Sequence, residues 1–409
     1  MWLKREDIIG FLDKHDYDVR KTGNARWIDQ KCVADVLTVV SDCILQYVET
    51  VEGEVQFTTK DIWHNPYTVE NVEQIFKKPN PIEKKAQSEY DKFFAQPMKL
   101  LAYAGILREM KKGTKNHYIV SCESRTLLEF IALRERNALL FLELYIVKVL
   151  RDSEIYHFFE RFFERQTKEE YDKLKCKFSS FTIEHTAIKG VVECNRIFTK
   201  VLNPLAFAFN KCGTEWGRIS RNKITYDMIV YNRDNFRDIH LEKPKDMTRK
   251  EYMAQQGIRP NVTYIAYSTQ KAKRIVRIFN ETFRNGKSEY NWGNDSELAT
   301  QIHHIFPESA YPEIAGHCEN LIALTPNQHY IHAHPNNNTN VVDKAYQQLL
   351  LIAKAHRIEE NLRDKGQDPI YEFSKFMFVL DYGLGSERFS EVDDGDYETA
   401  INEINWAYA

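Results

Sequence analysis

Apolar residues in the first third of the chain recur mostly at helical spacing. Between Trp27 and Val48 they return every three or four positions, which places them on one face of a helix. Thr58 or Thr59 is a suitable cap for a short helix that the Asn65–Pro66 step ends. We also expect helices at 68–76 and 93–107, a strand residue at Phe57, and a hairpin in REMKKGTKNHYIV around Gly113.

This order of strand, helices and hairpin is typical of a winged-helix DNA-binding domain. The hairpin tip would be the wing, because it carries Lys111, Lys112 and Lys115. An ordinary helical domain with a surface hairpin is the alternative interpretation. We expect residues 1–123 to form a winged-helix-like recognition domain. Residues 124–213, which are helical in pattern and rich in aromatic side chains, would form a connecting domain.

The charge of the chain changes after residue 213. Between Thr214 and Lys287 there are sixteen Lys and Arg residues against eight Asp and Glu residues. Lysine and arginine suit phosphate contacts, and the interleaved aromatic residues can stack on sugars or bases. A solvated charged surface is the alternative. The candidate DNA-binding residues are Arg218, Arg221, Arg233, Arg237, Lys271, Lys273 and Arg274.

The last part of the chain has the opposite charge. Residues 368–409 contain ten acidic residues against Lys375 and Arg388, which offsets the basic segment in a net charge of −3. We expect residues 367–409 to be an acidic extension. It would fold back on a neighbouring domain, act as a mimic that discourages nonspecific binding, or follow the core as a solubilising tail.

Six of the thirteen histidines lie in HHIFPESAYPEIAGHCENLIALTPNQHYIHAHP, which begins at His303. The apolar residues before it predict a strand that ends at the His303–His304 pair, and neighbouring side chains of a strand point to opposite faces. NLIAL predicts a second strand. Thr325 is a suitable helix N-cap, and Pro326 suits the first helical position. The segment should therefore fold as strand, loop, strand and helix.

This segment contains the side chains that phosphodiester hydrolysis needs. Two neutral imidazoles and water can hold a divalent metal ion, while another imidazole deprotonates a water molecule. The base activates the water, and the ion stabilises the charge of the transition state and the leaving oxygen. Mg²⁺ is the expected ion, with Mn²⁺, Ni²⁺ or Zn²⁺ as alternatives. We expect no small-molecule cofactor.

The same string resembles the HNH, or ββα-metal, nuclease motif from Leu298 to the helix expected at YQQLLLIAKAH. The paired histidines, the Asn–Leu start of the second strand and a helix histidine nine residues after that Asn occur in the family's order. The resemblance implies that His303 and His329 are metal ligands and that His304 is the general base. It also implies that Asn320 ties the loop together by hydrogen bonding to its backbone, and so belongs to the catalytic set.

The final metal ligand is left open by the pattern. The family often places it four residues after the helix histidine, where this chain has Ala333. His332 shares a helical face with His329, whereas His334 does so only if the helix has ended. We favour His334, because Pro335 disfavours helical geometry at the residue before it. A structural zinc site and a non-cleaving HNH fold are the alternatives.

The wider pattern resembles HNH-type type II restriction endonucleases, in GNARWIDQK, in SRNKITYDMIVYNRDNFRDI and in the histidine segment. The resemblance implies a sequence-specific double-strand DNA endonuclease. A homodimer is expected, because cutting both strands at one site usually needs two active centres. A homing or phage nuclease, or a DNA-binding regulator with a structural zinc–histidine cluster, is the alternative. The expected fold is α+β and mostly helical, with the nuclease domain at 214–366.

Cysteine spacing and hydropathy limit the class of protein further. The seven cysteines are widely spaced and form no CxxC pair, which indicates neither a disulfide framework nor a zinc ribbon. Charges interrupt the N-terminal segment, unlike the apolar core of a signal peptide, and no apolar run has the length of a membrane span. We therefore expect a cytoplasmic protein without membrane association.

Overall fold

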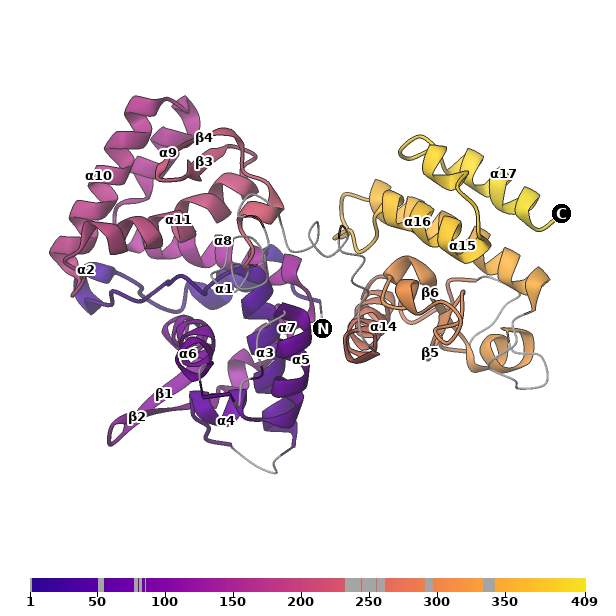
Figure 1. The fold of residues 1–409 in the computed structure, drawn as a ribbon, viewed down its shortest axis with the longest axis horizontal. Coiled ribbons are helices and arrows are strands. Elements are labelled where there is room, and N and C mark those ends of the chain that lie inside the picture. Colours follow the sequence, from indigo (N-terminus) through magenta and orange to yellow (C-terminus); the bar gives the residue numbers. More distant parts are fainter. Residues whose placement is uncertain are drawn as a thin grey trace. The chain divides into compact units, whose positions relative to one another are not determined.

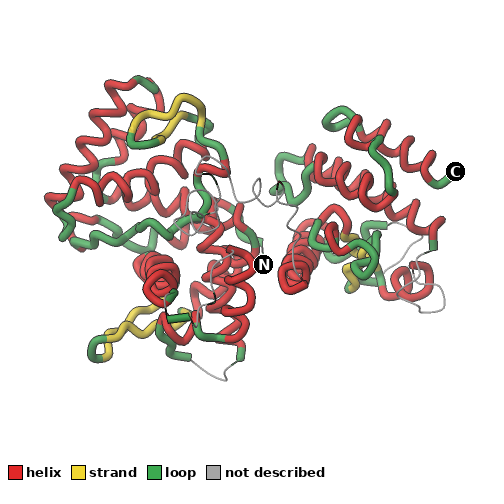
Figure 2. Tube along the Cα trace, in the orientation of Figure 1, coloured by secondary structure: helices red, strands yellow, loops and turns green. Residues whose placement is uncertain are grey.

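The computed structural model describes residues 2–50, 55–76, 80, 83–84, 86–231, 244, 255, 262–290, 297–333 and 343–409. Figure 1 follows the chain along its sequence, and Figure 2 distinguishes helices, strands and loops. The described residues are mostly helical and contain three two-stranded sheets, which confirms a mostly helical α+β fold. The chain divides into an N-terminal unit, Leu3–Arg259, and a C-terminal unit, Pro260–Ala409 with residues 1–2.

The N-terminal unit is a helical body with two hairpins. One apolar core runs through it and includes Ile8, Leu101, Phe159 and Tyr231, so the segments expected as recognition and connecting domains share a core. The helices are α1 (Arg5–Leu12), α2 (Val19–Thr22), α3 (Ala34–Glu49), α4 (Thr59–Trp63), α5 (Pro66–Phe76), α6 (Gln87–Tyr103), α7 (Arg125–Leu133), α8 (Glu135–Asp152), α9 (Tyr156–Arg165), α10 (Lys168–His185) and α11 (Val191–Ala208). The strands are β1 (Leu107–Lys112), β2 (Lys115–Val120), β3 (Cys212–Glu215) and β4 (Arg218–Lys223).

Local capping explains where several of these helices begin. The hydroxyl of Thr58 accepts a hydrogen bond from the Asp61 N–H at 3.3 Å, so the expected cap of α4 is confirmed. α4 ends at Trp63, before the Asn65–Pro66 step, as expected. Pro66 is also the first residue of α5, a position that suits proline. The helix expected from Trp27 begins at Ala34 instead. The residues before Ala34 form turns, in which the Asp29 carbonyl accepts from the Cys32 N–H at 3.0 Å.

The expected basic hairpin is confirmed as β1 and β2, which pair antiparallel from Leu107↔Val120 to Lys112↔Lys115. Phe57 adds an isolated bridge to Tyr118, which extends this sheet by one residue. Gly105 lies between α6 and β1 with φ +80°, and a Cβ there would lie 2.6 Å from Nε2 of His15. Glycine is therefore required at the turn that leads from α6 into the hairpin.

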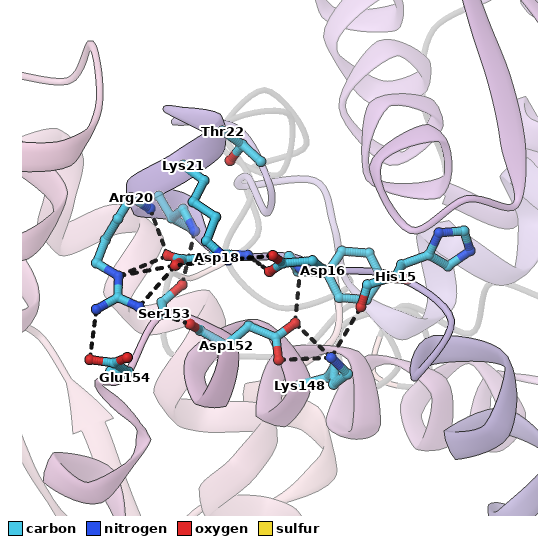
Figure 3. Close-up of polar contacts among 12 residues, drawn as sticks. His15, Asp16, Asp18, Arg20, Lys21, Thr22, Lys148, Asp152, Ser153 and Glu154 are labelled. Carbon is cyan, nitrogen blue, oxygen red and sulfur yellow. Dashed lines mark hydrogen bonds and ion pairs between the residues drawn. The ribbon is translucent and has the colours of Figure 1, made fainter.

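A charged network holds the chain before α2 against the end of α8 (Figure 3). Arg20 donates from Nη2 and Nε to the Asp18 carboxylate, both at 2.9 Å, and from Nη1 to Glu154 at 2.7 Å. Lys148 donates to both oxygens of Asp152 at 2.7 Å. The hydrogen bonds from Arg20 lower the pKa of Asp18, whose side chain is almost fully buried.

The C-terminal unit has its own apolar core, which includes Ile305, Ile322, Leu350, Phe376 and Ile404. The residues expected as an acidic extension contribute to this core through the helices Phe373–Leu384 and Tyr397–Ala407, so they are an integral part of the unit. The elements are α14 (Val262–Arg284), β5 (Gln301–His304), β6 (Leu321–Leu324), a π-helical turn (Gln328–Ala333), α15 (Lys344–Arg363), α16 (Phe373–Leu384) and α17 (Tyr397–Ala407).

Candidate functional site

Two histidines end a short strand in the C-terminal unit. β5 pairs antiparallel with β6, with His303 opposite Ile322 and His304 opposite Leu321. Adjacent strand residues point to opposite faces, so the two imidazoles leave the hairpin on different sides. His303 is 3% exposed, and His304 is half-buried. The strand–loop–strand arrangement expected from the sequence is therefore present.

Asn320 fastens the loop that joins the two strands. Its side-chain oxygen accepts from the Phe306 N–H at 2.8 Å, and its amide donates to the carbonyls of Phe306 at 3.0 Å and Ile314 at 3.3 Å. The side chain is fully buried, where each polar atom needs a partner. These are the backbone hydrogen bonds expected of Asn320, and they fix the loop immediately after His304.

The turn that carries His329 is held by its neighbours. Thr325 caps it through a hydrogen bond from the Gln328 N–H to Oγ1 at 3.2 Å, as expected from the sequence. Gln328 in turn accepts from the Ser288 hydroxyl at 2.5 Å and donates to the Tyr290 carbonyl at 2.9 Å. Residues 328–333 wind as a π-helix, a form that often occurs at functional sites.

His303 and His329 face one another across the hairpin and this turn. Their ring centres are 5.1 Å apart, and the ring planes lie at 80° to each other. A metal–nitrogen bond of about 2.0–2.1 Å puts each imidazole centre roughly 3 Å from the ion, and two tetrahedral ligands roughly 5 Å apart. The observed separation of the rings therefore fits two imidazoles that bind one ion.

A third protein ligand is not among the described residues. Within them, no three His, Cys, Asp or Glu side chains are close enough to hold one ion. The favoured third ligand, His334, lies outside the described residues. His332, its alternative, has its ring centre 5.7 Å from that of Tyr346. The fit to a metal ion thus rests on the His303–His329 pair.

His304 has a different environment from His303. Its Nε2 lies 3.1 Å from the carbonyl oxygen of Ala315, and because a carbonyl only accepts, Nε2 carries the proton in this contact. Burial and the positive charge of Lys273 lower the pKa of His304 to about 4. The ring is therefore neutral at pH 7, and Nδ1 retains a lone pair that can accept a proton.

The candidate DNA-binding residues do not all belong to one unit. Lys271, Lys273 and Arg274 are partly exposed on α14, which packs on β6 through Ala272 and Val276. Figure 1 shows α14 beside the β5–β6 hairpin. Arg218 and Arg221 are exposed on β4, in the N-terminal unit. Arg233 and Arg237 lie outside the described residues.

A buried ion pair that we did not predict from the sequence supports the hairpin. Lys354 is 0% exposed and donates to Glu289 at 2.9 Å and to the Tyr371 hydroxyl at 2.8 Å. Glu289 also accepts from the Ala323 N–H at 3.0 Å, so the pair ties α15 to β6. The sequence contains one indication of this burial. Lys354 lies one helical turn from both Leu350 and Ile358, which places it on the apolar face of α15.

No family model, curated protein or solved structure matches this chain. The site is therefore defined by its own geometry: one histidine pair in ring contact, a third histidine bonded to a carbonyl, and an asparagine that holds the loop. Among the described helices, none combines the length and apolar character that crossing a bilayer requires.

Proposed function

We propose that the C-terminal unit contains a metal-dependent nuclease site of the HNH type. His303 and His329 would hold one divalent ion, and His304 would be the general base. The proposal rests on the arrangement at the end of β5. There the ring centre of His303 lies 5.1 Å from that of His329, whereas the ring of the adjacent His304 bonds to the Ala315 carbonyl. One short hairpin thus gives two adjacent imidazoles separate environments.

His304 would start the reaction by taking a proton from water. Its Nδ1 is the basic nitrogen, because the Ala315 carbonyl keeps the proton on Nε2. The activated water would then attack a backbone phosphorus and displace the sugar oxygen. A bound divalent ion would supply positive charge that stabilises the transition state and the leaving oxygen. Asn320 holds the loop after His304 and so would keep the base in position.

The proposed substrate is double-stranded DNA, cut at a specific sequence as by a type II restriction endonuclease. The positive side chains of α14 would contact phosphates beside the hairpin. The winged-helix proposal for the N-terminal unit is supported by α4, α5 and α6 followed by the β1–β2 hairpin, whose tip residues Lys111, Lys112 and Lys115 are exposed. Cutting both strands at one site would be explained by a homodimer with two such centres.

In the winged-helix proposal, Tyr67 to Gln74 of α5 would read the bases, but burial and hydrogen bonding limit which of these side chains could do so. The hydroxyl of Tyr67, the first residue of the stretch expected to read bases, donates to Asp42 at 2.6 Å. Thr68, Asn71 and Val72 are buried. The exposed or partly exposed side chains of this stretch, such as Glu70 and Gln74, are therefore the better candidates within α5.

Digestion of long DNA of known sequence with the purified chain tests this proposal. With Mg²⁺ or Mn²⁺ we expect discrete fragments, whose mapped ends share one short sequence, and EDTA should stop the reaction. Fragments with random ends would support a nonspecific nuclease instead. If DNA binds but stays intact with every divalent ion tried, the DNA-binding regulator with a structural zinc site is the better account.

A further inference from the structure

The β3–β4 hairpin of the N-terminal unit presents an exposed tryptophan at its tip. Glu215 pairs with Arg218, so Trp216 and Gly217 form a two-residue turn. Their φ angles are +53° and +75°. Trp216 is 77% exposed, which is the second largest exposure among the large apolar side chains of the described residues. Its ring is thus almost entirely available to a ligand.

A tryptophan is an unfavourable choice for this turn position. Two-residue hairpin turns with positive φ at both central residues favour Asn–Gly, Asp–Gly or Gly–Gly. A bulky side chain at positive φ is a genuine outlier, and such strain is often stored at functional sites. Because the exposed ring gains little from packing, the stability of the hairpin does not account for Trp216.

Two arginines and one glutamate lie beside the ring of Trp216: Arg218, Arg221 and Glu215. With Ile219, they line an open cavity of about 640 Å³ on the surface of the hairpin. Within the part of the chain that the structure describes, neither Arg218 nor Arg221 forms an ion pair. The segment 211–223 contains four basic residues and one acidic residue. The cavity therefore suits a ligand that combines a flat ring with negative charge.

The hairpin beneath the tip is firmly anchored. Thr214 donates from its N–H to Oδ1 of Asn203 at 2.8 Å and accepts from Nδ2 of Asn203 at 3.0 Å. The Thr214 hydroxyl also bonds to that of Tyr171 at 2.6 Å. Lys175 donates to the Gly217 carbonyl at 2.8 Å, directly at the turn. The ring of Trp216 is thus attached to a backbone that is already ordered, which reduces the entropy lost on binding.

We propose that Trp216 stacks on an unstacked base of DNA while Arg218 and Arg221 contact the phosphates on either side. Every base has a π-face on which tryptophan can stack, and arginine suits phosphate geometry. This inference deepens the proposed function and rests on it for the identity of the ligand. The contact would favour DNA in which a base has left the helical stack, as at a kinked or distorted step.

The test is the affinity of the full chain for two short duplexes in EDTA, followed by fluorescence anisotropy. One duplex is regular, and the other has one additional, extrahelical adenine. We expect wild type to prefer the second. Trp216→Asn should weaken its binding to that duplex about 5- to 100-fold. Because asparagine suits positive φ, the same variant should keep or raise the Tm. Trp216→Phe should retain most of the preference.

The controls separate this contact from other roles of the hairpin. Trp406→Ala removes a tryptophan of 62% exposure from α17 and should leave the preference unchanged. The double variant with Arg218→Ala and Arg221→Ala should reduce the slope of log affinity against log salt concentration by about two, because two phosphate contacts are lost. If Trp216→Asn keeps the wild-type affinity and the wild-type preference, the inference is overturned. The same conclusion holds if this variant changes only the self-association of the chain and not its DNA binding.

Cleavage by wild type distinguishes this inference from the proposed function. If wild type cuts DNA and Trp216→Asn binds both duplexes normally, the inference is wrong and the nuclease proposal stands. If Trp216→Asn loses the preference but wild type cuts nothing, the DNA contact stands and the nuclease proposal fails. Absence of any DNA binding by wild type would contradict both.

Discussion

The imidazoles of His303 and His329 lie 5.1 Å apart at 80° to each other, although a loop and a second strand separate them in the sequence. The antiparallel pairing of β5 with β6 brings the two segments together, and Gln328 fixes the turn that carries His329. Two imidazoles at this distance can share a metal ion. The proposed metal site rests on this pair of imidazoles.

Replacement of His329 by Ala should weaken the binding of Mn²⁺ or Ni²⁺ at least tenfold, because one of two identified ligands is lost. Isothermal titration calorimetry measures this directly. His356→Ala is the matched control, since His356 lies on the exposed side of α15 with 63% of its side chain accessible. Equal affinity in wild type and His329→Ala would remove His329 from the metal site.

Asn320→Ala should destabilise the C-terminal unit by about 2–4 kcal/mol. The Phe306 N–H and the carbonyls of Phe306 and Ile314 would lose a buried partner, and each unsatisfied group costs about 1–3 kcal/mol before relaxation. Urea unfolding, followed by a probe in this unit, gives the change. Asn405→Ala, which removes only an exposed hydrogen bond to Gln348, should change stability by less than about 1 kcal/mol. Equal effects of the two variants would contradict the role assigned to Asn320.

Lys354→Met should be more destabilising than an ordinary loss of an ion pair. It leaves Glu289 buried and charged without its cation, which typically costs about 3–5 kcal/mol. Adding Glu289→Gln should recover part of this loss, because glutamine is uncharged and can still accept from the Ala323 N–H. Arg363→Met removes an exposed pair with Glu359 on the same helix and should cost less than about 1 kcal/mol. Chemical denaturation compares all three. No recovery in the double variant would argue against an unpaired charge as the cause.

Local patterns and long-range contacts differ in how well the sequence predicts them. The β1–β2 hairpin, the two strands β5 and β6 and the Thr325 cap depend on residues close in the sequence, and the local pattern predicted each of them. The hydrogen bonds of Asn320 to the loop were expected from the resemblance to the HNH motif. The buried pair of Lys354 and Glu289 joins distant segments, so a pattern along one helix does not identify the partner.

Two features of the candidate site also depend on tertiary structure. The π-winding after Thr325 coincides with two hydrogen bonds between Gln328 and the segment before β5: Gln328 donates to the Tyr290 carbonyl and accepts from the Ser288 hydroxyl. No local propensity includes these contacts. The basic residues 214–287 look continuous in sequence, yet Arg218 and Lys273 belong to different compact units. The composition of a segment shows its charge, but it does not show which compact unit contains each charged residue.

Acid should weaken the N-terminal unit through Asp18. Arg20 lowers the pKa of Asp18 in the folded protein below the usual value of about 3.9. The stabilisation is therefore fully present above that usual value and is lost as the pH falls through the lower, folded pKa. The free energy of unfolding can be measured by chemical denaturation at steps of about 1 pH unit from about pH 6 to about pH 2. It should fall less steeply with decreasing pH in Asp18→Asn than in wild type. Arg20→Gln removes the main cause and should also flatten the profile; identical slopes in all three proteins would rule out this linkage.

The most direct test of the central claim is single-turnover cleavage of plasmid DNA by wild type and His304→Ala in saturating Mg²⁺. We expect the variant to cleave about 10²- to 10⁴-fold more slowly, because a positioned general base usually contributes a factor of this size. Its Tm, DNA affinity and metal affinity should stay close to those of wild type, because the Nε2 contact to Ala315 is the one side-chain hydrogen bond described for this residue. Cleavage by His304→Ala at the wild-type rate, or no cleavage by wild type with any divalent ion, would contradict the account.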